Sequence, residues 1–310
     1  MSMRVAVADV GSNTIKLLVA ERAPDGTLRE VESRTLDVRI SAGIGSGTPE
    51  LSPASMDRGL AAIEDLAADA RRHGAERIRA VATSAVRDAA NGAAFRARVR
   101  ERTGIELNIL SGPEEARLIG LGLTTDPALA HLRDFNVYDL GGGSLECICF
   151  RDRQVEQAVS LPLGCVRLTE KFVADPSAPF TGAEGLAEAR HVEATLRASG
   201  FPTRVEPMVA VVGCGGTVTT SRAILGAESG LKMAQAPSRV EVASLRRIFT
   251  QVSALDLAQR RRVPGLNAAR ADVFPTALAT LLTLADLGGF DAFQHSLRNL
   301  RWGLAASLLG

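Results

Sequence analysis

The sequence is poor in lysine and carries almost no net charge, and both shortages limit its partners. Lys16, Lys171 and Lys232 are its only lysines, so nearly all positive charge is arginine. Arginine presents a rigid fork of donors that suits phosphate oxygens, although a coding bias towards arginine gives the same composition. The formal net charge is +1, so no overall field indicates a nucleic-acid partner. Any affinity for a polyanion must therefore be local.

Cysteine is also scarce, and a long uninterrupted apolar run is missing. The cysteines are Cys147, Cys149, Cys165 and Cys214. They form no CxxC pair and no cluster with histidine, so we expect neither structural zinc nor a disulfide framework. The N-terminus, MSMRVAVADVGSN, lacks the apolar core of a signal peptide, and the apolar stretch 274–287 contains Pro275 and Asp286. These features predict a cytoplasmic protein without a membrane span.

The chain repeats one hairpin pattern. Its start, VAVADVGSNTIKLLV, reads as a strand, an aspartate, a Gly/Ser turn and a second strand. The segment FNVYDLGGGSLECICF, from residue 135, has the same order. A repeat on this scale predicts two similar domains that face each other, and we place them at 1–124 and 125–310. The last helix is expected to be able to pack back on the first domain.

Three glycine-containing turns follow expected strands. Glycine at a strand end lets backbone N–H groups converge on a ligand, and such concavities bind phosphate oxygens. Ser12, Asn13, Ser144 and Thr217 would add side-chain donors. One such turn is usually only a turn, whereas three are hard to explain without a phosphate. The turns are Gly11-Ser12-Asn13, Gly141-Gly142-Gly143-Ser144 and Gly213-Cys214-Gly215-Gly216-Thr217.

Acidic residues accompany two of these turns. Asp9 and Asp139 end the first strands of the two repeats. A carboxylate beside a phosphate repels it unless a cation lies between them, so the pair implies Mg²⁺, or Mn²⁺ as the alternative. Glu146 lies on the same strand face as Ser144 and is expected to hold the water shell of the metal; otherwise it is an exposed strand position.

A hydrolase also needs a base that orients water, and the segment SGPEEAR supplies candidates. Its two glutamates, Glu114 and Glu115, begin an expected helix and point in different directions, so only one can face a site. Arg87 follows an expected strand, and Arg270 precedes an expected apolar helix. Each is either a phosphate ligand or part of a surface ion pair. The run 260–262 is predicted to be a solvated helix end.

The motifs ADVGSNTIKLLV, ATSAVRDA, SGPEEARL, YDLGGGSLE, SLPLGCVRLTE and VVGCGGT occur in this order. Together they resemble the exopolyphosphatase/guanosine pentaphosphate phosphatase family in its short form. That family belongs to the actin, sugar kinase and heat-shock chaperone ATPase superfamily. The resemblance implies an α/β fold of two actin-like (ribonuclease H-like) domains. Each would have a mixed five-stranded sheet flanked by helices, with the active site in the cleft between the domains.

The resemblance also implies roles for individual residues. Glu115 matches the catalytic base, and Asp139 and Glu146 match the acidic residues around the divalent metal, to which Asp9 is added from the repeat. Leu145 stands where the family usually has threonine, which leaves the substrate preference open. The matched phosphate-binding positions are Gly11, Ser12, Asn13, Arg87, Gly141, Gly142, Gly143, Ser144, Cys165, Gly215, Gly216, Thr217 and Arg270.

The expected activity is metal-dependent hydrolysis of the terminal phosphate of inorganic polyphosphate. The nearest alternative is removal of the 5′ phosphate of guanosine pentaphosphate. An ATP-dependent kinase or ATPase of the same superfamily, and a non-catalytic sensor of polyphosphate or alarmone, are more distant alternatives. A homodimer is also expected.

Overall fold

The computed structural model describes residues 3–41 and 49–310, and the chain divides into two compact units. Unit 1 comprises Met1–Ala130 and Arg298–Gly310, and unit 2 comprises His131–Leu297. In this division residues 125–130 and the last helix fall in unit 1. Within the described ranges, every helix is too short or too polar to cross a membrane.

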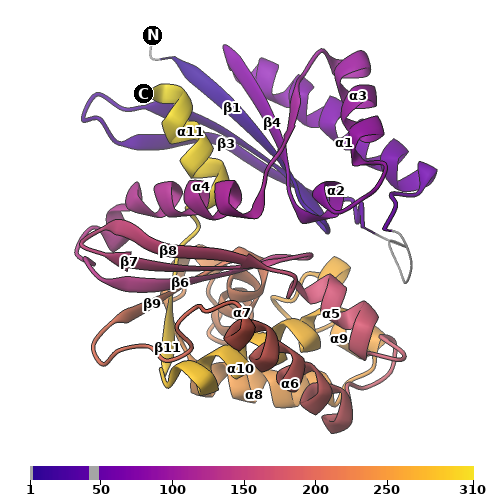
Figure 1. Ribbon diagram of the computed structural model, residues 1–310, viewed down its shortest axis with the longest axis vertical. Helices are drawn as coiled ribbons and strands as arrows, with labels where there is room; N and C mark the ends of the chain where they lie inside the picture. Colours follow the sequence, from indigo (N-terminus) through magenta and orange to yellow (C-terminus); the bar gives the residue numbers. More distant parts are fainter. Residues whose placement is uncertain (1–2, 42–48) are drawn as a thin grey trace. The chain divides into compact units, whose positions relative to one another are not determined.

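Unit 1 is built on a mixed sheet of five strands (Figure 1). The first three strands along the chain pair antiparallel with one another, whereas β4 lies parallel to β1 and β5 lies parallel to β4. In spatial order the strands are β3 (Leu28–Asp37), β2 (Thr14–Arg22), β1 (Arg4–Val10), β4 (Arg77–Ala82) and β5 (Leu107–Ile109).

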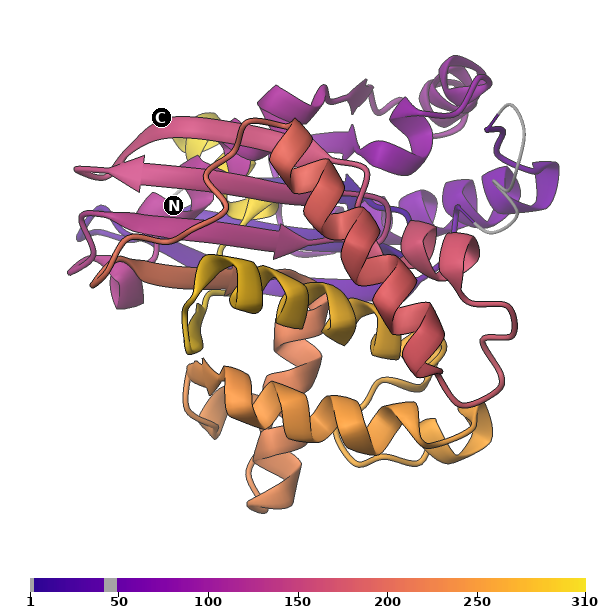
Figure 2. The same cartoon turned by 60° about the horizontal axis from the view of Figure 1, so that its bottom comes forward.

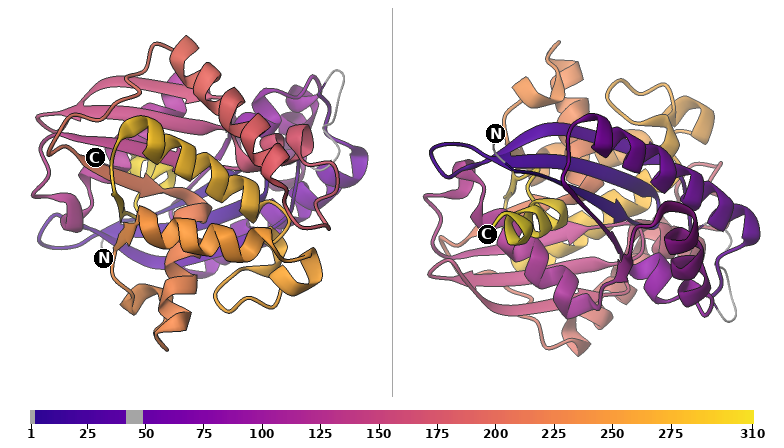
Figure 3. Two further views of the ribbon diagram at one scale, coloured as in Figure 1. Left: turned by 90° about the horizontal axis from the view of Figure 1, so that it is seen from below. Right: turned by 90° about the horizontal axis from the view of Figure 1, so that it is seen from above.

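Helices cover both faces of this sheet (Figure 3). Apolar residues at helical spacing in α1, such as Leu60 and Ile63, pack with Phe95 of α3 against one face. Trp302 of α11 packs against the other face with Val5. The helices of unit 1 are α1 (Pro53–Arg72), α2 (Ser84–Arg87), α3 (Gly92–Thr103), α4 (Gly112–Thr124) and α11 (Leu300–Leu309).

Helices α4 and α11 approach so closely that their backbones touch. A Cβ atom on Gly303 would overlap the carbonyl oxygen of Leu118, and one on Gly122 would overlap the carbonyl oxygen of Asn299. Glycine is required here because no other residue leaves the two backbones in contact. This contact and the Trp302 packing fix the C-terminal helix to unit 1.

Unit 2 contains six strands rather than the expected five. Short strands β10 and β11 pair with each other, and β11 lies parallel to β9. Strands of three and four residues are too short to give a sequence periodicity, so neither carries a local signal in the sequence. In spatial order the strands are β10 (Arg239–Glu241), β11 (Ala292–His295), β9 (Ala210–Cys214), β6 (Phe135–Leu140), β7 (Leu145–Arg151) and β8 (Gln154–Leu161).

Helices α6 and α10 lie across one face of this sheet, and α8 packs outside α10 (Figure 2). The fold class is thus confirmed as two mixed sheets flanked by helices. Glu188 of α6 is fully buried in this layer, where Thr280 of α10 donates to its Oε1 at 2.8 Å. The helices of unit 2 are α5 (Cys165–Phe172), α6 (Gly182–Ala198), α7 (Gly215–Glu228), α8 (Val242–Ser253), α9 (Leu257–Arg260) and α10 (Phe274–Gly288).

The predicted solvated helix end at 260–262 is wrong for Arg260, whereas Arg261 and Arg262 are exposed. The Arg260 side chain is 1% exposed, and its guanidinium donates to the carbonyl oxygens of Ala271, Pro176 and Ala178 at 3.0, 2.8 and 2.6 Å. Burial of a charge is costly unless it is hydrogen-bonded, and these carbonyls satisfy both terminal nitrogens of the guanidinium, although Nε has no partner in the described chain. Arg260 therefore fixes the segment that carries Arg270.

Candidate active site

The first two glycine turns have the same local geometry. The N–H of Gly11 donates to the carbonyl oxygen of Thr14 at 3.1 Å, and that of Gly141 donates to Ser144 at 3.0 Å. A Cβ on Gly11 or Gly141 would lie 3.1 or 3.3 Å from the same carbonyl oxygen. The sequence repeat is therefore also a repeat in backbone conformation.

In the first turn, carbonyl groups are held by neighbouring backbone. The carbonyl oxygen of Ser12 accepts from Ser41, and that of Asn13 accepts from Val38 and Arg39. Within the described ranges, the N–H groups of Ser12 and Asn13 have no such acceptor. Asn13 is 4% exposed, and neither its Nδ2 nor its Oδ1 has a hydrogen-bond partner. The turn thus offers its donors to an anion.

In the second turn, the start of α5 holds the carbonyl groups. The N–H groups of Cys165 and Val166 donate to the carbonyl oxygens of Gly141 and Gly142 at 3.0 and 2.8 Å. A Cβ on Gly164 would overlap the backbone of Gly142 and Gly143. With their carbonyls turned towards α5, Gly142 and Gly143 have N–H groups that meet no acceptor in the described chain.

The third glycine segment lies beside the second in unit 2. Gly215 has a φ of +85°, and a Cβ on it would lie 2.7 Å from Oδ1 of Asp139. A Cβ on Gly216 would overlap the guanidinium of Arg270. Arg270 is 8% exposed, and its Nε is without a partner, as is Oγ1 of the fully buried Thr217. Buried donors without partners indicate a ligand, because burial without a hydrogen bond is costly.

Cys165 completes this group, since its Sγ lies 4.0 Å from Nη2 of Arg270. Burial raises the pKa of its thiol, although Arg270 opposes the shift. Cys165 is therefore a neutral, buried side chain that packs against the arginine.

The two matched aspartates face different partners. In unit 2, Asp139 of β6 is paired in register with Glu146 of β7, whose Oε1 accepts from Ser160 at 2.8 Å. In unit 1, Asp9 is paired in register with Lys16. Residues opposite each other on antiparallel strands share a face, so Asp139 and Glu146 place two carboxylates together.

The donor set in unit 2 fits a divalent cation. Two neighbouring carboxylates repel each other unless a cation lies between them. Mg²⁺ is bound by one or two carboxylates together with water and phosphate oxygens. No group of three or more acidic, histidine or cysteine residues in the described chain is arranged around a common metal position. Water and substrate would thus complete the coordination.

Asp9 fits a metal less well. Burial raises its pKa, and the positive charges of Lys16 and Arg301 only partly oppose that shift. Lys16 already supplies the cation that the repeat suggested for this carboxylate. Asp139 and Glu146 therefore fit a divalent metal better than Asp9 does.

The structure separates the two adjacent glutamates of α4. Glu114 forms a capping box with Ser111, and these hydrogen bonds lower its pKa. Glu115 is 5% exposed, and its Oε2 accepts from Nη1 of Arg87 at 2.8 Å. Arg87 Nη1 also donates to the carbonyl oxygen of Leu110 at 3.1 Å. The structure thus joins the predicted base to the predicted phosphate arginine, both in unit 1.

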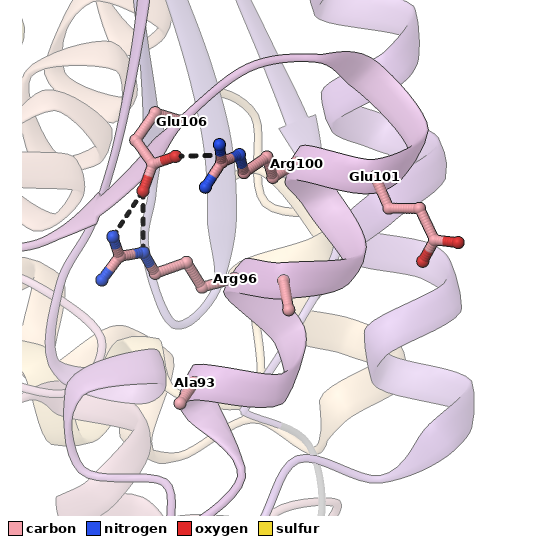
Figure 4. Close-up of a pocket in the computed structure, with 6 residues that line it drawn as sticks. Ala93, Arg96, Arg100, Glu101 and Glu106 are labelled. Atoms are coloured by element: carbon pink, nitrogen blue, oxygen red, sulfur yellow. Dashed lines mark hydrogen bonds and ion pairs between the residues drawn. The ribbon is translucent and has the colours of Figure 1, made fainter.

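A pocket of about 510 Å³ in unit 1 contains no predicted site residue (Figure 4). Arg96 and Arg100 of α3 line it and both pair with Glu106, at 2.9 and 3.7 Å. Glu106 engages both guanidinium groups, and Glu101 also lines the pocket, so two carboxylates balance the two positive charges and the pocket does not have the character of an anion site.

Three further residues support the turns and were missed in the sequence. The Ser84 hydroxyl lies 3.1 Å from that of Ser12, Ser160 contacts Glu146, and Nε of Arg167 donates to the carbonyl oxygen of Gly143 at 3.0 Å. All three lie inside motifs of the sequence, Ser84 in ATSAVRDA and both Ser160 and Arg167 in SLPLGCVRLTE, but the contacts they make depend on the fold.

Comparison with known proteins agrees with these features. The Ppx/GppA phosphatase family matches residues 18–310. The chain is 32% identical over 320 residues to exopolyphosphatase 2 of Mycobacterium tuberculosis, with 99% of both chains covered. It is 32% identical to exopolyphosphatase 1 of Mycobacterium bovis, with 87% of this chain and 77% of that protein covered.

Solved structures share the whole fold. The Aquifex aeolicus Ppx/GppA enzyme is 25% identical, with a TM-score of 0.79 and coverage of 99% and 100%. An exopolyphosphatase from Cytophaga hutchinsonii is 22% identical and supports the fold alone, with a TM-score of 0.87 and coverage of 99% and 98%. The chain, a phosphatase by sequence and by fold, belongs to the Ppx/GppA phosphatase family.

Proposed function

We propose that this phosphatase is an exopolyphosphatase that removes the terminal phosphate of inorganic polyphosphate. Full-length similarity to a mycobacterial exopolyphosphatase supports the substrate class. The first two glycine turns support binding of phosphate, because their carbonyl groups accept hydrogen bonds from the protein while N–H groups of the same turns meet no backbone acceptor in the described chain.

The proposed chemistry draws on residues of each unit. Unit 1 contributes Glu115 and the first turn, and unit 2 contributes the acidic pair and the other two glycine segments. Each unit alone lacks part of the chemistry, since the base and the carboxylate pair lie in different units. The turns, with Asn13 and Arg270, bind the negatively charged oxygens.

Asp139 and Glu146 would hold Mg²⁺, which supplies charge neutralisation at phosphate oxygens when bound. Glu115 orients the attacking water and accepts its proton. Arg87 keeps the Glu115 carboxylate in place through Nη1, and its Nη2 is engaged by no group in the described chain. That nitrogen is available for a phosphate oxygen.

The burial of Glu115 against Arg87 is the observation that carries hydrolysis. A phosphate-binding turn serves kinases and hydrolases equally, whereas a hydrolase needs a base that orients water. Glu115 is a buried carboxylate fixed by Arg87, whereas its neighbour Glu114 caps the helix, so Glu115 is the glutamate positioned to act as a base. A non-catalytic sensor would have no use for it.

The neighbouring glutamates allow a matched test. We expect Glu115→Gln to lower kcat for phosphate release from polyphosphate at least ~100-fold, the scale of a general base. Glu114→Gln keeps a capping-box partner, since glutamine serves at that position, and should remain near wild type. Equal activity of the two variants would refute the role of Glu115.

The substrate itself is tested by comparing kcat/KM for polyphosphate and guanosine pentaphosphate in the purified protein. A higher value for the nucleotide would replace the proposed substrate while leaving the chemistry intact. Removal of divalent metal with a chelator should abolish turnover, and Asp139→Asn should weaken its restoration by Mg²⁺. Full activity in the chelated protein would refute the metal assignment.

A further inference from the structure

Behind the third glycine segment lies a chain of polar side chains that the proposed chemistry does not use. His295 ends β11 beside Gly213 and is 4% exposed. Its Nδ1 lies 3.3 Å from Nη1 of Arg222, and its Nε2 lies 3.1 Å from Oγ1 of Thr219. Thr219 Oγ1 in turn lies 2.9 Å from the carbonyl oxygen of Gly215.

The donors and acceptors of these groups fix the direction of each hydrogen bond in this series of side chains. A guanidinium has only donors, so Arg222 donates and Nδ1 of His295 accepts. The imidazole proton is therefore on Nε2, which donates to Thr219. The threonine hydroxyl has one hydrogen, and a carbonyl oxygen only accepts, so that hydrogen goes to Gly215. His295 is consequently a neutral imidazole in a single tautomer.

Arg222 anchors the far end of the chain. Its Nε donates to the carbonyl oxygen of Ala236 at 3.1 Å, and its side chain is buried. The guanidinium therefore cannot swing away without leaving donors unsatisfied, which would cost free energy. The position of His295, between a fixed donor and Thr219, follows from this anchor.

At the other end of this series of side chains, Thr219 contacts a peptide group of the third glycine segment. The carbonyl of Gly215 and the N–H of Gly216 belong to the same peptide group. A hydrogen bond accepted at the carbonyl polarises the peptide and strengthens its N–H as a donor. This N–H lies in the first turn of α7, where N–H groups have no partner within the helix. The guanidinium of Arg270 lies against the same residue.

We propose that Arg222, His295 and Thr219 form a positioning relay that holds the Gly215–Gly216 peptide with its N–H directed at a substrate phosphate oxygen. Gly215 has no side chain that could fix this peptide, and its φ of +85° lies where glycine is most free. The relay rests on the proposed function, since it needs a phosphate at this segment. None of its three side chains touches the substrate.

The kinetic test removes one hydrogen bond at a time. We expect Thr219→Val to raise KM for polyphosphate about tenfold, because one strengthened hydrogen bond contributes roughly 1.5 kcal/mol. Thr219→Ser keeps the hydroxyl and should restore most of the affinity. Thr283→Val is the matched control: Thr283 makes the same bond to the carbonyl four residues earlier, in α10, at 2.9 Å. This control should leave KM unchanged.

A double variant distinguishes a relay from separate contacts. His295→Phe should raise KM as much as Thr219→Val, and the combination of both should be no worse than either, because each breaks the same chain. Losses that multiply in the double variant would overturn the proposal. So would a wild-type KM for Thr219→Val.

Nuclear magnetic resonance tests the relay without turnover. The imidazole nitrogens of His295 should show the proton on Nε2, and Thr219→Val should move the Gly216 amide resonance while Thr283→Val leaves it in place. A proton on Nδ1, or an unchanged Gly216 amide, would overturn the relay. If the resonances behave as described but the wild type releases no phosphate, the hydrogen bonds of the relay are established, while the proposed function fails together with the role of the Gly216 N–H in binding phosphate.

Discussion

Glu188 gives unit 2 a defined dependence of stability on pH. This carboxyl is fully buried between α6 and α10, and its only hydrogen bond in the described chain is with Thr280, while Oε2 has none. Burial raises its pKa to about 8, from an ordinary value of 4.5, and the Thr280 hydrogen bond opposes the shift only partly. The folded protein therefore keeps this group protonated at neutral pH.

The direction of this pH dependence follows from the number of protons bound by the folded and unfolded chains. Between the two pKa values the folded chain holds one proton that the unfolded chain has released, so stability falls as pH rises. The slope is about 1.4 kcal/mol per pH unit, since one pKa unit corresponds to that free energy. From about pH 5.5 to about pH 7.5 this single group lowers the free energy of unfolding by about 3 kcal/mol.

Glu188→Gln removes the titration, and the measurement is the free energy of unfolding by urea for both proteins at several pH values. All other titrating groups cancel in the difference, so the variant should gain on the wild type by about 3 kcal/mol over that interval. Glu184→Gln, on the same helix, is the control. Because the pKa of Glu184 is lowered, this substitution should change the pH dependence of the free energy of unfolding only in acid. A Glu188→Gln difference that does not change with pH would refute the reasoning.

Three other substitutions test the packing around the site. Gly216→Ala should push the guanidinium of Arg270 aside and raise KM for polyphosphate about tenfold with little change in melting temperature, and an unchanged KM would exclude Arg270 from binding. Gly303→Ala should cost about 3 kcal/mol in urea unfolding, because its Cβ would overlap the Leu118 carbonyl, and an unaffected midpoint would contradict the close contact. Arg260→Met should also cost about 3 kcal/mol by the same measurement, since three buried carbonyls lose their donors, whereas a more stable variant would show that burying the charge costs more than it returns.

The hairpins and the α4 helix could be predicted from the sequence because their signals are local. The strand–turn–strand pattern spans only about a dozen residues, and Ser111 with Glu114 forms the capping box that its spacing suggests. The pairing of Asp9 with Lys16 was also readable, since the four-residue turn fixes the register of the two strands. This register pairs Asp9 with a lysine, whereas Asp139 is paired with Glu146.

The missed features depend on contacts between distant residues. Arg260 is buried because carbonyls from residues 176 and 178 receive its donors, and its sequence neighbours give no sign of this. Strand β11 is four residues long, and its pairing with β9 brings together segments about 80 residues apart. His295 and Thr219 meet only because of that pairing, so the relay was invisible in the sequence.

The return of α11 to unit 1 has a consequence for synthesis of the chain. Trp302 and Ala305 cover the face of β1 and β2 that includes Val5 and Leu18, yet a ribosome makes these helical residues about 280 residues later. Until they emerge, that face is exposed to the cell and open to chaperones and proteases. Unit 2 is continuous in sequence and can fold during translation, whereas unit 1, with Glu115 and the first turn, matures only after residues 298–310 have left the ribosome.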